Sequence, residues 1–316
     1  MLKRTVMAAA LAFAMAGEAA AQDALKVAIG QRGNWNAMIC ELGQRAGIFA
    51  KHGLKLEALY TSGGGETQQA VISGSVDVGT AVGTLGALGA FSKGAPIRII
   101  GAETTGAADY WYAAATSAIK SLKDTDGKTI AYSTNGSSTH SVVLAFMKEL
   151  GLKARPVATG NPPTTLTQVM TGQVDVGWAA PPFGLKEIDE GKIRIVARAN
   201  DSSLVKGQTI RLLITNAVAW EKRRDALVRF LDGYRESLDY MYSDDPRVMK
   251  DYGELVGVSP EMGKRVREFF AKDMLDPDEI KGLPSLQAEG VALKYMDAEL
   301  TPDQLKTLIQ IPPRKK

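Results

Sequence analysis

The sequence predicts an α/β protein with two similar lobes, and two observations carry that prediction. The first is an internal repeat: TQQAVISGSVDVGTA at 67–81 and TLTQVMTGQVDVGWA at 165–179 share Thr, Val, Gly, Val, Asp, Val, Gly and Ala at a constant offset of 98 residues. The second is an alternation of short apolar runs with segments of helical periodicity, which is typical of parallel sheets flanked by helices. The period is too long for a solenoid and indicates one structural unit per lobe.

The repeat extends beyond this core, since GLK at 53–55 recurs at 151–153 and IRI at 97–99 recurs at 193–195. In the first lobe we expect strands at 25–29, 54–59, 76–80 and 97–100, and helices at 36–49, 66–73 and 84–92. In the second lobe we expect strands at 129–132, 154–158, 174–178 and 193–197, and helices at 137–150 and 165–171.

Segments 110–115 and 209–214 are expected to cross between the lobes. After the return the chain is dominated by predicted helices, at 225–242, 247–255, 261–272, 285–298 and 302–309. Proline stands at or near four of their starts, a position that helix entry favours. The expected division is therefore a signal peptide at 1–21, a discontinuous first lobe of 22–110 and 212–316, and a second lobe of 111–211.

The N-terminus has the features of a secretory signal peptide. Lys3 and Arg4 precede an apolar run at 6–16, and three alanines at 19–21 supply a small-residue cleavage site. The run is too short to anchor the chain in a bilayer, and Glu18 disfavours the alternative of a cytosolic helix. Cleavage leaves Gln22 rather than a lipid-accepting cysteine at the start, so we expect a protein released into a Gram-negative periplasm.

Composition excludes several other classes. Removing Lys3, Arg4 and Glu18 changes the formal charge from +3 to +2 (3 − 2 + 1), which gives no reason to expect binding to nucleic acid or to a membrane surface. The single cysteine, Cys40, cannot form an internal disulfide and is expected to be packed within a helix. With two histidines and one cysteine we expect no metal site. We also expect no cofactor and a monomeric protein.

Six short motifs occur in a fixed order along the chain: AGIF at 46–49, HGL at 52–54, SGSVDVG at 73–79, GAPI at 94–97, GSSTH at 136–140 and GQVDVG at 172–177. In this order the chain resembles the periplasmic binding proteins of ABC importers, in the sulfonate/nitrate/taurine-binding branch related to the thiamine-pyrimidine binders. The resemblance implies the type II fold of that class, with two α/β lobes that close on a small ligand and dock on a membrane permease.

Ligands of open parallel sheets bind beyond the carboxyl ends of the strands. The loops that follow strands form three repeat-related pairs: 31–36 with 133–138, 80–84 with 178–183, and 102–105 with 198–201. The candidate ligand-binding residues in the first two pairs and the adjoining helix start are Arg32, Trp35, Asn36, Thr80, Gly83, Thr84, Asn135, Ser137, Ser138, Thr139, Trp178, Pro181 and Phe183.

The loop at 133–139 follows a strand and opens a helix, so its N–H groups and hydroxyls suit a sulfonate, carboxylate or phosphate; ordinary helix capping is the alternative. Trp35 and Trp178 could sandwich an apolar or planar part of the ligand, unless each packs on its own lobe. Arg32 could pair with an anion, although exposure is the commoner fate of arginine. One of the aromatic residues at 110–112 should face the cleft.

Catalytic interpretations are weaker. Ser137 and His140 can face each other on a helix, but the sequence offers no G-x-S-x-G elbow and no identifiable orienting acid. Asp77 and Asp175 occupy equivalent repeat positions at strand starts, where turn or capping roles are expected. We therefore expect a binder of a small anion and not an enzyme; the alternatives are a secreted enzyme of the same fold and a binder of a neutral heterocycle.

Overall fold

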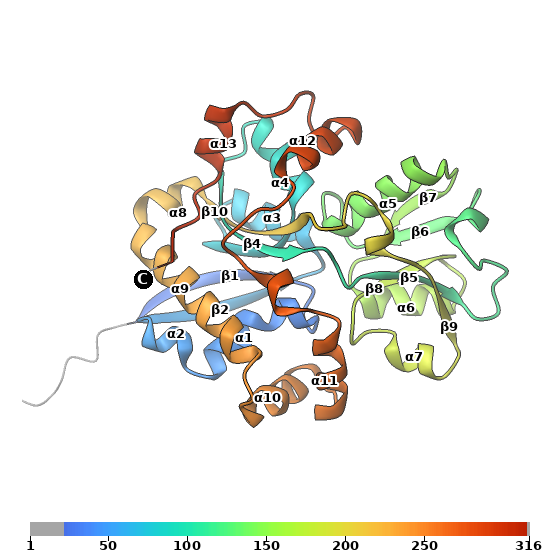
Figure 1. Cartoon of the computed structure of the whole chain (residues 1–316), viewed down its shortest axis with the longest axis horizontal. Coiled ribbons are helices and arrows are strands. Elements are labelled where there is room, and N and C mark those ends of the chain that lie inside the picture. Colours follow the sequence, from blue (N-terminus) through green and yellow to red (C-terminus); the bar gives the residue numbers. More distant parts are fainter. Residues whose placement is uncertain (1–21, 315–316) are drawn as a thin grey trace, which may run out of the picture.

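The computed structural model describes residues 22–314, and it divides into two lobes, each built on its own sheet (Figure 1). The predicted signal peptide at 1–21 and the last two residues, 315–316, lie outside the described residues. The first sheet has the order β2-β1-β3-β10-β4. Its strands are β1 (Asp23–Gly30), β2 (Leu54–Thr61), β3 (Val78–Gly83), β4 (Ile97–Thr105) and β10 (Thr209–Asn216).

The second sheet repeats this order. A three-stranded part, β8-β5-β9, joins the pair β6-β7 through a parallel bridge between Ile130 and Val176, which gives β7-β6-β8-β5-β9. Its strands are β5 (Tyr110–Ala114), β6 (Thr129–Tyr132), β7 (Arg155–Ala158), β8 (Gly177–Ala179) and β9 (Ile193–Arg198). In each sheet the fourth position holds an antiparallel strand that the chain forms just after it crosses from the other lobe.

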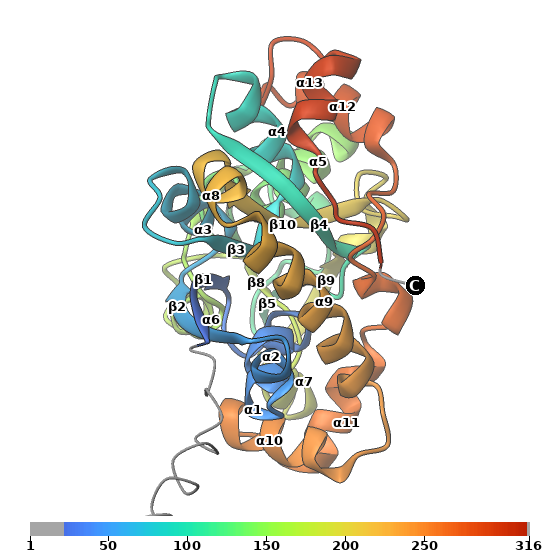
Figure 2. The same cartoon turned by 90° about the vertical axis from the view of Figure 1, so that its left-hand side faces the viewer.

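Helices cover both sheets (Figures 1 and 2). The first lobe carries η1 (Trp35–Met38), α1 (Ile39–Arg45), α2 (Ile48–Lys51), α3 (Gly64–Ile72), α4 (Thr84–Ser92), α8 (Ala217–Lys222), α9 (Arg224–Met241), α10 (Pro246–Val256), α11 (Pro260–Glu268), η4 (Lys272–Leu275), α12 (Leu283–Ala292) and α13 (Pro302–Leu308). The second lobe carries η2 (Leu122–Asp124), α5 (Ser138–Leu150), α6 (Pro162–Met170) and α7 (Leu185–Asp189), and η3 (Ala199–Asp201) lies on the return crossing.

Several predicted elements differ from the structure at their ends, such as the helix expected at 285–298, which ends at Ala292, and two predictions differ more deeply. The single helix expected at 36–49 is instead η1, α1 and the start of α2, because Gly47 takes a left-handed conformation (φ 77°) that ends α1. The segments expected to cross between the lobes are β5 and β10 themselves, each seated inside a sheet. The chain passes between the lobes just before them, at 106–109 and at 199–208.

The repeated aspartates cap strand starts, as the sequence suggested. An Asp77 carboxylate oxygen accepts a hydrogen bond from the Lys26 backbone N–H in β1 (2.8 Å), and an Asp175 oxygen accepts one from the Thr129 N–H in β6 (2.9 Å). Both carboxylates therefore satisfy backbone donors at the amino ends of the sheets, which are opposite to the carboxyl ends where ligands bind.

The two crossings are tied to each other. Both Asp109 carboxylate oxygens accept hydrogen bonds from the Arg211 guanidinium (2.8 Å each), and the two side chains are 2% and 3% exposed. The Asn200 side-chain amide bonds both the N–H and the C=O of Ala107 (3.1 and 2.9 Å), and the Gly106 N–H donates to the Gln208 carbonyl (2.8 Å). These contacts hold the two crossing segments, 106–109 and 199–208, together, and we call this pair of segments the braced hinge.

Replacing Asp109 with alanine should destabilise the protein strongly, because it leaves the Arg211 guanidinium buried without its charge partner. We expect the free energy of unfolding to fall by about 3–5 kcal/mol, measured by urea denaturation. The double variant Asp109→Leu/Arg211→Met should recover much of this loss, and Glu190→Ala, on the surface, should change stability little. Equal stability of Asp109→Ala and wild type would contradict the brace.

Candidate functional site

The two lobes meet at the carboxyl ends of their strands, through unusually close backbone contacts. The Gly65 N–H at the start of α3 donates to the Thr134 hydroxyl of the second lobe (3.0 Å). A Cβ on Gly83 would lie 2.6 Å from the Ser138 nitrogen, and one on Gly86 would lie 2.2 Å from the Gly136 carbonyl oxygen. Glycine is thus required at these places for the lobes to approach this closely.

Three helix N-termini converge on this seam. Helices α3 and α4 begin after Gly63 and Gly83, neither of which can offer a capping side chain, while α5 is capped by the Ser137 hydroxyl, which accepts from the His140 backbone N–H (3.2 Å). The first turns of α4 and α5 hold no acidic residue. The helix dipoles from both lobes therefore favour negative charge at the seam, and Glu66 in the first turn of α3 opposes this at one of the three termini.

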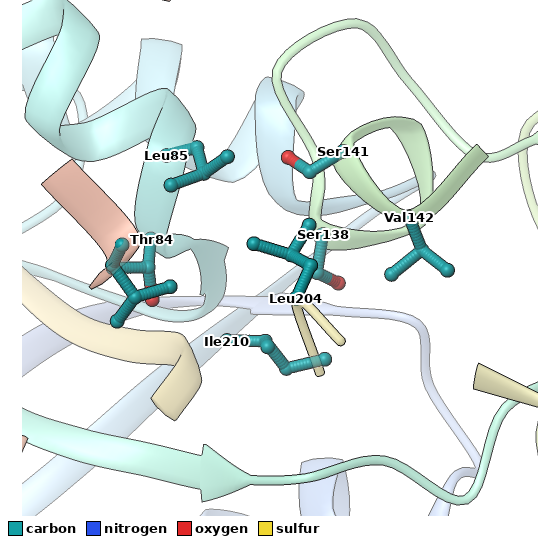
Figure 3. A pocket seen from close by; sticks show the side chains of 8 residues that line it. Thr84, Leu85, Ser138, Ser141, Val142, Leu204 and Ile210 are labelled. Carbon is teal, nitrogen blue, oxygen red and sulfur yellow. The ribbon is translucent and has the colours of Figure 1, made fainter. Parts of the chain in front are cut away.

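A small cavity lies between α4 and α5 (Figure 3). Thr84, Ser138 and Ser141 line it together with five aliphatic residues, and the surface that faces the cavity is apolar: Leu85, Val142, Leu204, Ile210 and Leu286. The Thr84 hydroxyl donates to the Thr209 carbonyl (2.7 Å). The cavity volume is about 10 Å³, close to the minimum that one water molecule needs. Any larger guest requires the lobes to separate.

Several buried polar side-chain atoms have no hydrogen-bond partner among residues 22–314. They include the Thr80 hydroxyl in β3, the Trp178 indole N–H in β8, and the Gln68 side-chain oxygen. Gln68 lies beside the seam, since its oxygen is 3.3 Å from a Cβ built on Gly86. Buried polar groups are rarely left unpaired, so the Gln68 oxygen is a candidate ligand contact at the seam.

Ser137 and His140 do not form a nucleophile–base pair. The Ser137 hydroxyl caps the helix, while the His140 ring nitrogen Nδ1 lies 3.2 Å from the Gly136 N–H and 2.9 Å from the Tyr295 hydroxyl. The ring is stacked near Tyr132 (4.4 Å between centroids), and burial lowers the pKa of His140 to about 4. His140 is therefore neutral near pH 7 and is hydrogen-bonded to Tyr295, in the segment that follows α12 of the other lobe.

Two predicted residues lie away from the seam. The Arg32 side chain is 51% exposed; its guanidinium sits 4.6 Å above the Tyr60 ring and pairs with Glu41 (3.9 Å). Trp35 is fully buried in its own lobe, and its indole N–H donates to the Tyr242 hydroxyl (3.1 Å). The anion-pairing arginine and the aromatic sandwich are therefore not formed, because both side chains find partners within the first lobe.

The other predicted residues divide between the seam and the loops that shape it. Gly83, Thr84, Ser137 and Ser138 meet at the helix termini, and Thr80 and Trp178 supply the unpaired polar atoms. The Asn135 side chain accepts from the Tyr132 hydroxyl (2.6 Å), and the Thr139 hydroxyl accepts from the Ser133 N–H (2.9 Å), so these two stabilise the loop itself.

Asn36, Pro181 and Phe183 are the remaining predicted ligand-binding residues. The Asn36 amide donates to the buried Glu103 carboxylate (2.8 Å), whose pKa is raised by burial. Phe183, two residues after Pro181, reaches across to the first lobe, where its ring atom Cζ would lie 2.9 Å from a Cβ on Gly33. Phe183 is thus an inter-lobe contact.

Strand alternation resolves the aromatic triplet of β5. The Trp111 indole N–H donates to the Ala131 carbonyl, and its ring packs edge-on against Phe146 under α5. Tyr110 and Tyr112 point to the opposite face, where the Tyr110 hydroxyl donates to the Phe183 carbonyl and Tyr112 lines a pocket between the lobes.

Sequence reasoning missed Ser141 and the residues that the C-terminal helices bring to the seam. Ser141 could have been predicted from the sequence, because it follows Ser137 by one helical turn. Leu286 and Tyr295 lie outside the repeat, so no pattern related them to α5. Two inter-lobe ion pairs were also unforeseen: Arg265 with Asp189 (2.6 and 2.9 Å), and Lys148 with Glu289 (3.1 Å).

The described residues offer neither a metal centre nor a membrane-spanning helix. No group of histidine, cysteine, aspartate and glutamate within 22–314 is arranged to hold a metal ion. Over the same residues, no helix combines the length and apolarity needed to cross a membrane.

A family model described as NMT1/THI5 like matches residues 34–247, more than half of the chain. No curated protein matches the chain in sequence. Several hundred solved chains share its fold, with the alkanesulfonate-binding protein SsuA from Xanthomonas axonopodis pv. citri, bound to MOPS, among the most similar (TM-score 0.77, 18% identity, covering 93% of this chain and 100% of that one).

Two more solved structures have the same arrangement. The periplasmic aliphatic sulphonate binding protein SsuA from Escherichia coli has a TM-score of 0.69 at 18% identity, covering 93% of this chain and 94% of that one. The periplasmic nitrate-binding protein NrtA from Synechocystis PCC 6803 has a TM-score of 0.71 at 13% identity, covering 92% and 86%. At these identities the likeness establishes the fold, which is that of periplasmic binding proteins.

The lowered pKa of His140 should make stability depend on pH. As pH falls below 6.5, a histidine in the unfolded chain takes up a proton, while the folded ring stays neutral until about pH 4. Stability from this group is therefore complete above pH 6.5 and declines toward pH 4. In urea denaturation at pH 7.5 and 5, His140→Gln should lose less stability on acidification than wild type. An identical pH dependence would contradict this assignment.

Reversing the charge of Arg265 should open the lobes. Arg265→Glu places a carboxylate against Asp189, so repulsion replaces attraction at one rim of the seam. We expect a larger radius of gyration in small-angle X-ray scattering, restored by the double variant Arg265→Glu/Asp189→Arg. Arg247→Glu is the matched control, because Arg247 pairs with Asp245 within the first lobe. Equal radii of gyration for Arg265→Glu and wild type would contradict the role of the Arg265–Asp189 ion pair in holding the lobes closed.

Proposed function

The chain belongs to the NMT1/THI5-like family, and on that premise we propose that it is the solute-binding component of an ABC-type importer, which captures a small anion between its two lobes. The carrying observation is the convergence of three helix N-termini at a seam where α4 and α5 have no acidic residue in their first turns. Helix N-termini combine unpaired N–H donors with partial positive charge, which suits anions.

The wall of the seam favours an organic anion with a short apolar part. Five aliphatic side chains line the cavity together with Ser138 and Ser141 in the first turn of α5, so a sulfonate or carboxylate head can reach the helix terminus while its carbon chain contacts leucine and valine. The solved relatives whose names mention alkanesulfonate, sulphonate and nitrate binding support an anionic ligand.

Capture requires motion. The cavity of about 10 Å³ is far smaller than a sulfonate ion, so the lobes must separate at the seam and close again around the ligand. A ligand that touches both lobes binds the closed state better than the open state and shifts the population toward it. The braced hinge at 106–109 and 199–208 is the segment that bends.

The remaining parts of the proposal concern place and partners. The signal-peptide pattern at 1–21 supports secretion to the periplasm without a lipid anchor, and the permease of an importer is the partner that receives the ligand. The helix-capping role of Ser137 and the neutral, hydrogen-bonded His140 favour binding over catalysis. We also propose that the protein acts as a monomer of two lobes, divided near 110 and 211.

The proposal is tested by a ligand screen and one substitution. In a thermal-shift screen of alkanesulfonates, carboxylates, nitrate and neutral heterocycles, a ligand at a hundred times its dissociation constant should add about 2.7 kcal/mol of stability. Ser138→Asp should weaken the best anion at least tenfold, about 1.4 kcal/mol, because it places a carboxylate where the ligand's charge must sit.

Ser73→Asp is the matched control, since Ser73 is exposed at the far end of α3. Circular dichroism verifies the fold of both variants, and calorimetry gives the affinities. Unchanged affinity of Ser138→Asp would rule out the anion site, and a neutral ligand held near Trp178 would then be the better account.

A further inference from the structure

A second, larger pocket opens between the lobes on the opposite face of the second sheet. Its volume is about 220 Å³, and it has no lining residue in common with the cavity between α4 and α5. The second lobe contributes Pro162 and Leu166 from α6 and Phe183 from the loop after β8. The first lobe contributes Val256 and Val258, which flank the turn between α10 and α11.

The chemistry of this pocket differs from that of the seam. Proline rings, leucine, valine and a phenylalanine ring form most of the wall, and Glu187 adds a carboxylate that disfavours an anionic head group. An apolar cavity of about 150 Å³ is known to take a benzene molecule, so the present pocket has room for a group of roughly six to eight carbon atoms. It is too small for a complete drug-sized ligand.

We propose that this pocket binds an uncharged apolar group of a small molecule and that its occupation stabilises the closed state. The reason is geometric: a guest that touches both Leu166 and Val258 contacts two lobes, and those contacts exist together only when the lobes are closed. The site goes beyond the proposed anion capture and does not depend on the helix termini.

The ion pair at the rim acts as the closure of this pocket. Asp189 lies at the end of α7, two residues after the lining residue Glu187, and Arg265 lies on α11, which follows Val258 directly. When the guanidinium of Arg265 meets the carboxylate of Asp189 with two parallel hydrogen bonds, the valine turn is brought over the pocket. Filling the pocket and forming the ion pair therefore favour the same state.

The apolar group has two sources, the tail of the captured anion or a separate neutral molecule. Hexan-1-ol, hexanesulfonate and methanesulfonate distinguish them, since the first has only the tail, the last has only the head, and hexanesulfonate has both. Val258→Trp fills the pocket from the first lobe and Leu166→Trp fills it from the second. Val218→Trp is the matched control, because Val218 is 52% exposed on α8.

We expect wild type and Val218→Trp to bind hexan-1-ol in saturation-transfer NMR, and both filled variants to bind it at least tenfold more weakly, since burial of each methylene is worth about a fourfold change. Hexanesulfonate binding at least tenfold more tightly than methanesulfonate to wild type, but not to the filled variants, identifies the occupant as the anion's tail. Equal sulfonate affinities with retained hexan-1-ol binding identify a separate molecule.

The remaining outcomes separate this inference from the proposed function. If no sulfonate binds while hexan-1-ol binding still depends on Val258 and Leu166, the pocket stands and an anion site for sulfonates does not. If hexan-1-ol fails to bind wild type, or binds the two filled variants as tightly as wild type, the pocket assignment is overturned, whatever happens to methanesulfonate.

Discussion

A buried ion pair between Arg211 and Asp109 joins the two segments that carry the second lobe, and the rest of the structure depends on it. Both side chains are almost completely excluded from water, so each charge is tolerable only while the other is present. Because the pair stands where β10 re-enters the first sheet, the crossings cannot slide past each other without separating buried charges. In the proposed capture mechanism, motion is therefore confined to bending of the two joined crossings, which lets the lobes open as rigid bodies and meet again in the same register.

The contacts that oppose opening are of another kind. The ion pairs at the rims of the seam are solvent-exposed, and exposed pairs contribute little to stability because water and salt screen them. At the centre the lobes touch through glycine backbone, a few hydroxyls and the aliphatic side chains that line the cavity between α4 and α5. Opening therefore exposes apolar surface as well as breaking the rim ion pairs, and a ligand that contacts both lobes adds to what favours the closed state.

Much of the fold could be predicted because the two halves of the repeat share local hydrogen bonds as well as residue types. Thr61 with Thr67 in the first lobe, and Thr159 with Thr165 in the second, form hydroxyl–hydroxyl hydrogen bonds of 2.7 and 2.6 Å at the same offset of 98 residues. Local patterns also located the helix termini at the seam. They did not locate Arg32 and Trp35, because the position of a residue in a loop does not reveal its tertiary partners. Arg32 lies over the Tyr60 ring, and Trp35 donates to the Tyr242 hydroxyl. Leu286 of α12 and Tyr295 after it could not be predicted to contact α5, since both lie in the C-terminal part of the chain, outside the repeat.

The places where the two lobes differ are more informative than those where they agree. Helix α3 starts after Gly63, whereas its counterpart α6 starts after Asn161, whose side chain accepts from the Thr164 N–H (3.0 Å). The Gly65 N–H in the first turn of α3 donates across the seam to the Thr134 hydroxyl, whereas the start of α6 is capped within its own lobe. Thr80 stands at the repeat position that Trp178 holds in the second lobe, so a small polar side chain in one lobe corresponds to an indole in the other. A symmetric pair of lobes would offer a ligand two equal ends, and this pair differs both in the capping of its helix starts and in the size of the residue at this strand position. Such polarity suits a molecule whose own two ends differ, with the charge on one side and the carbon skeleton on the other.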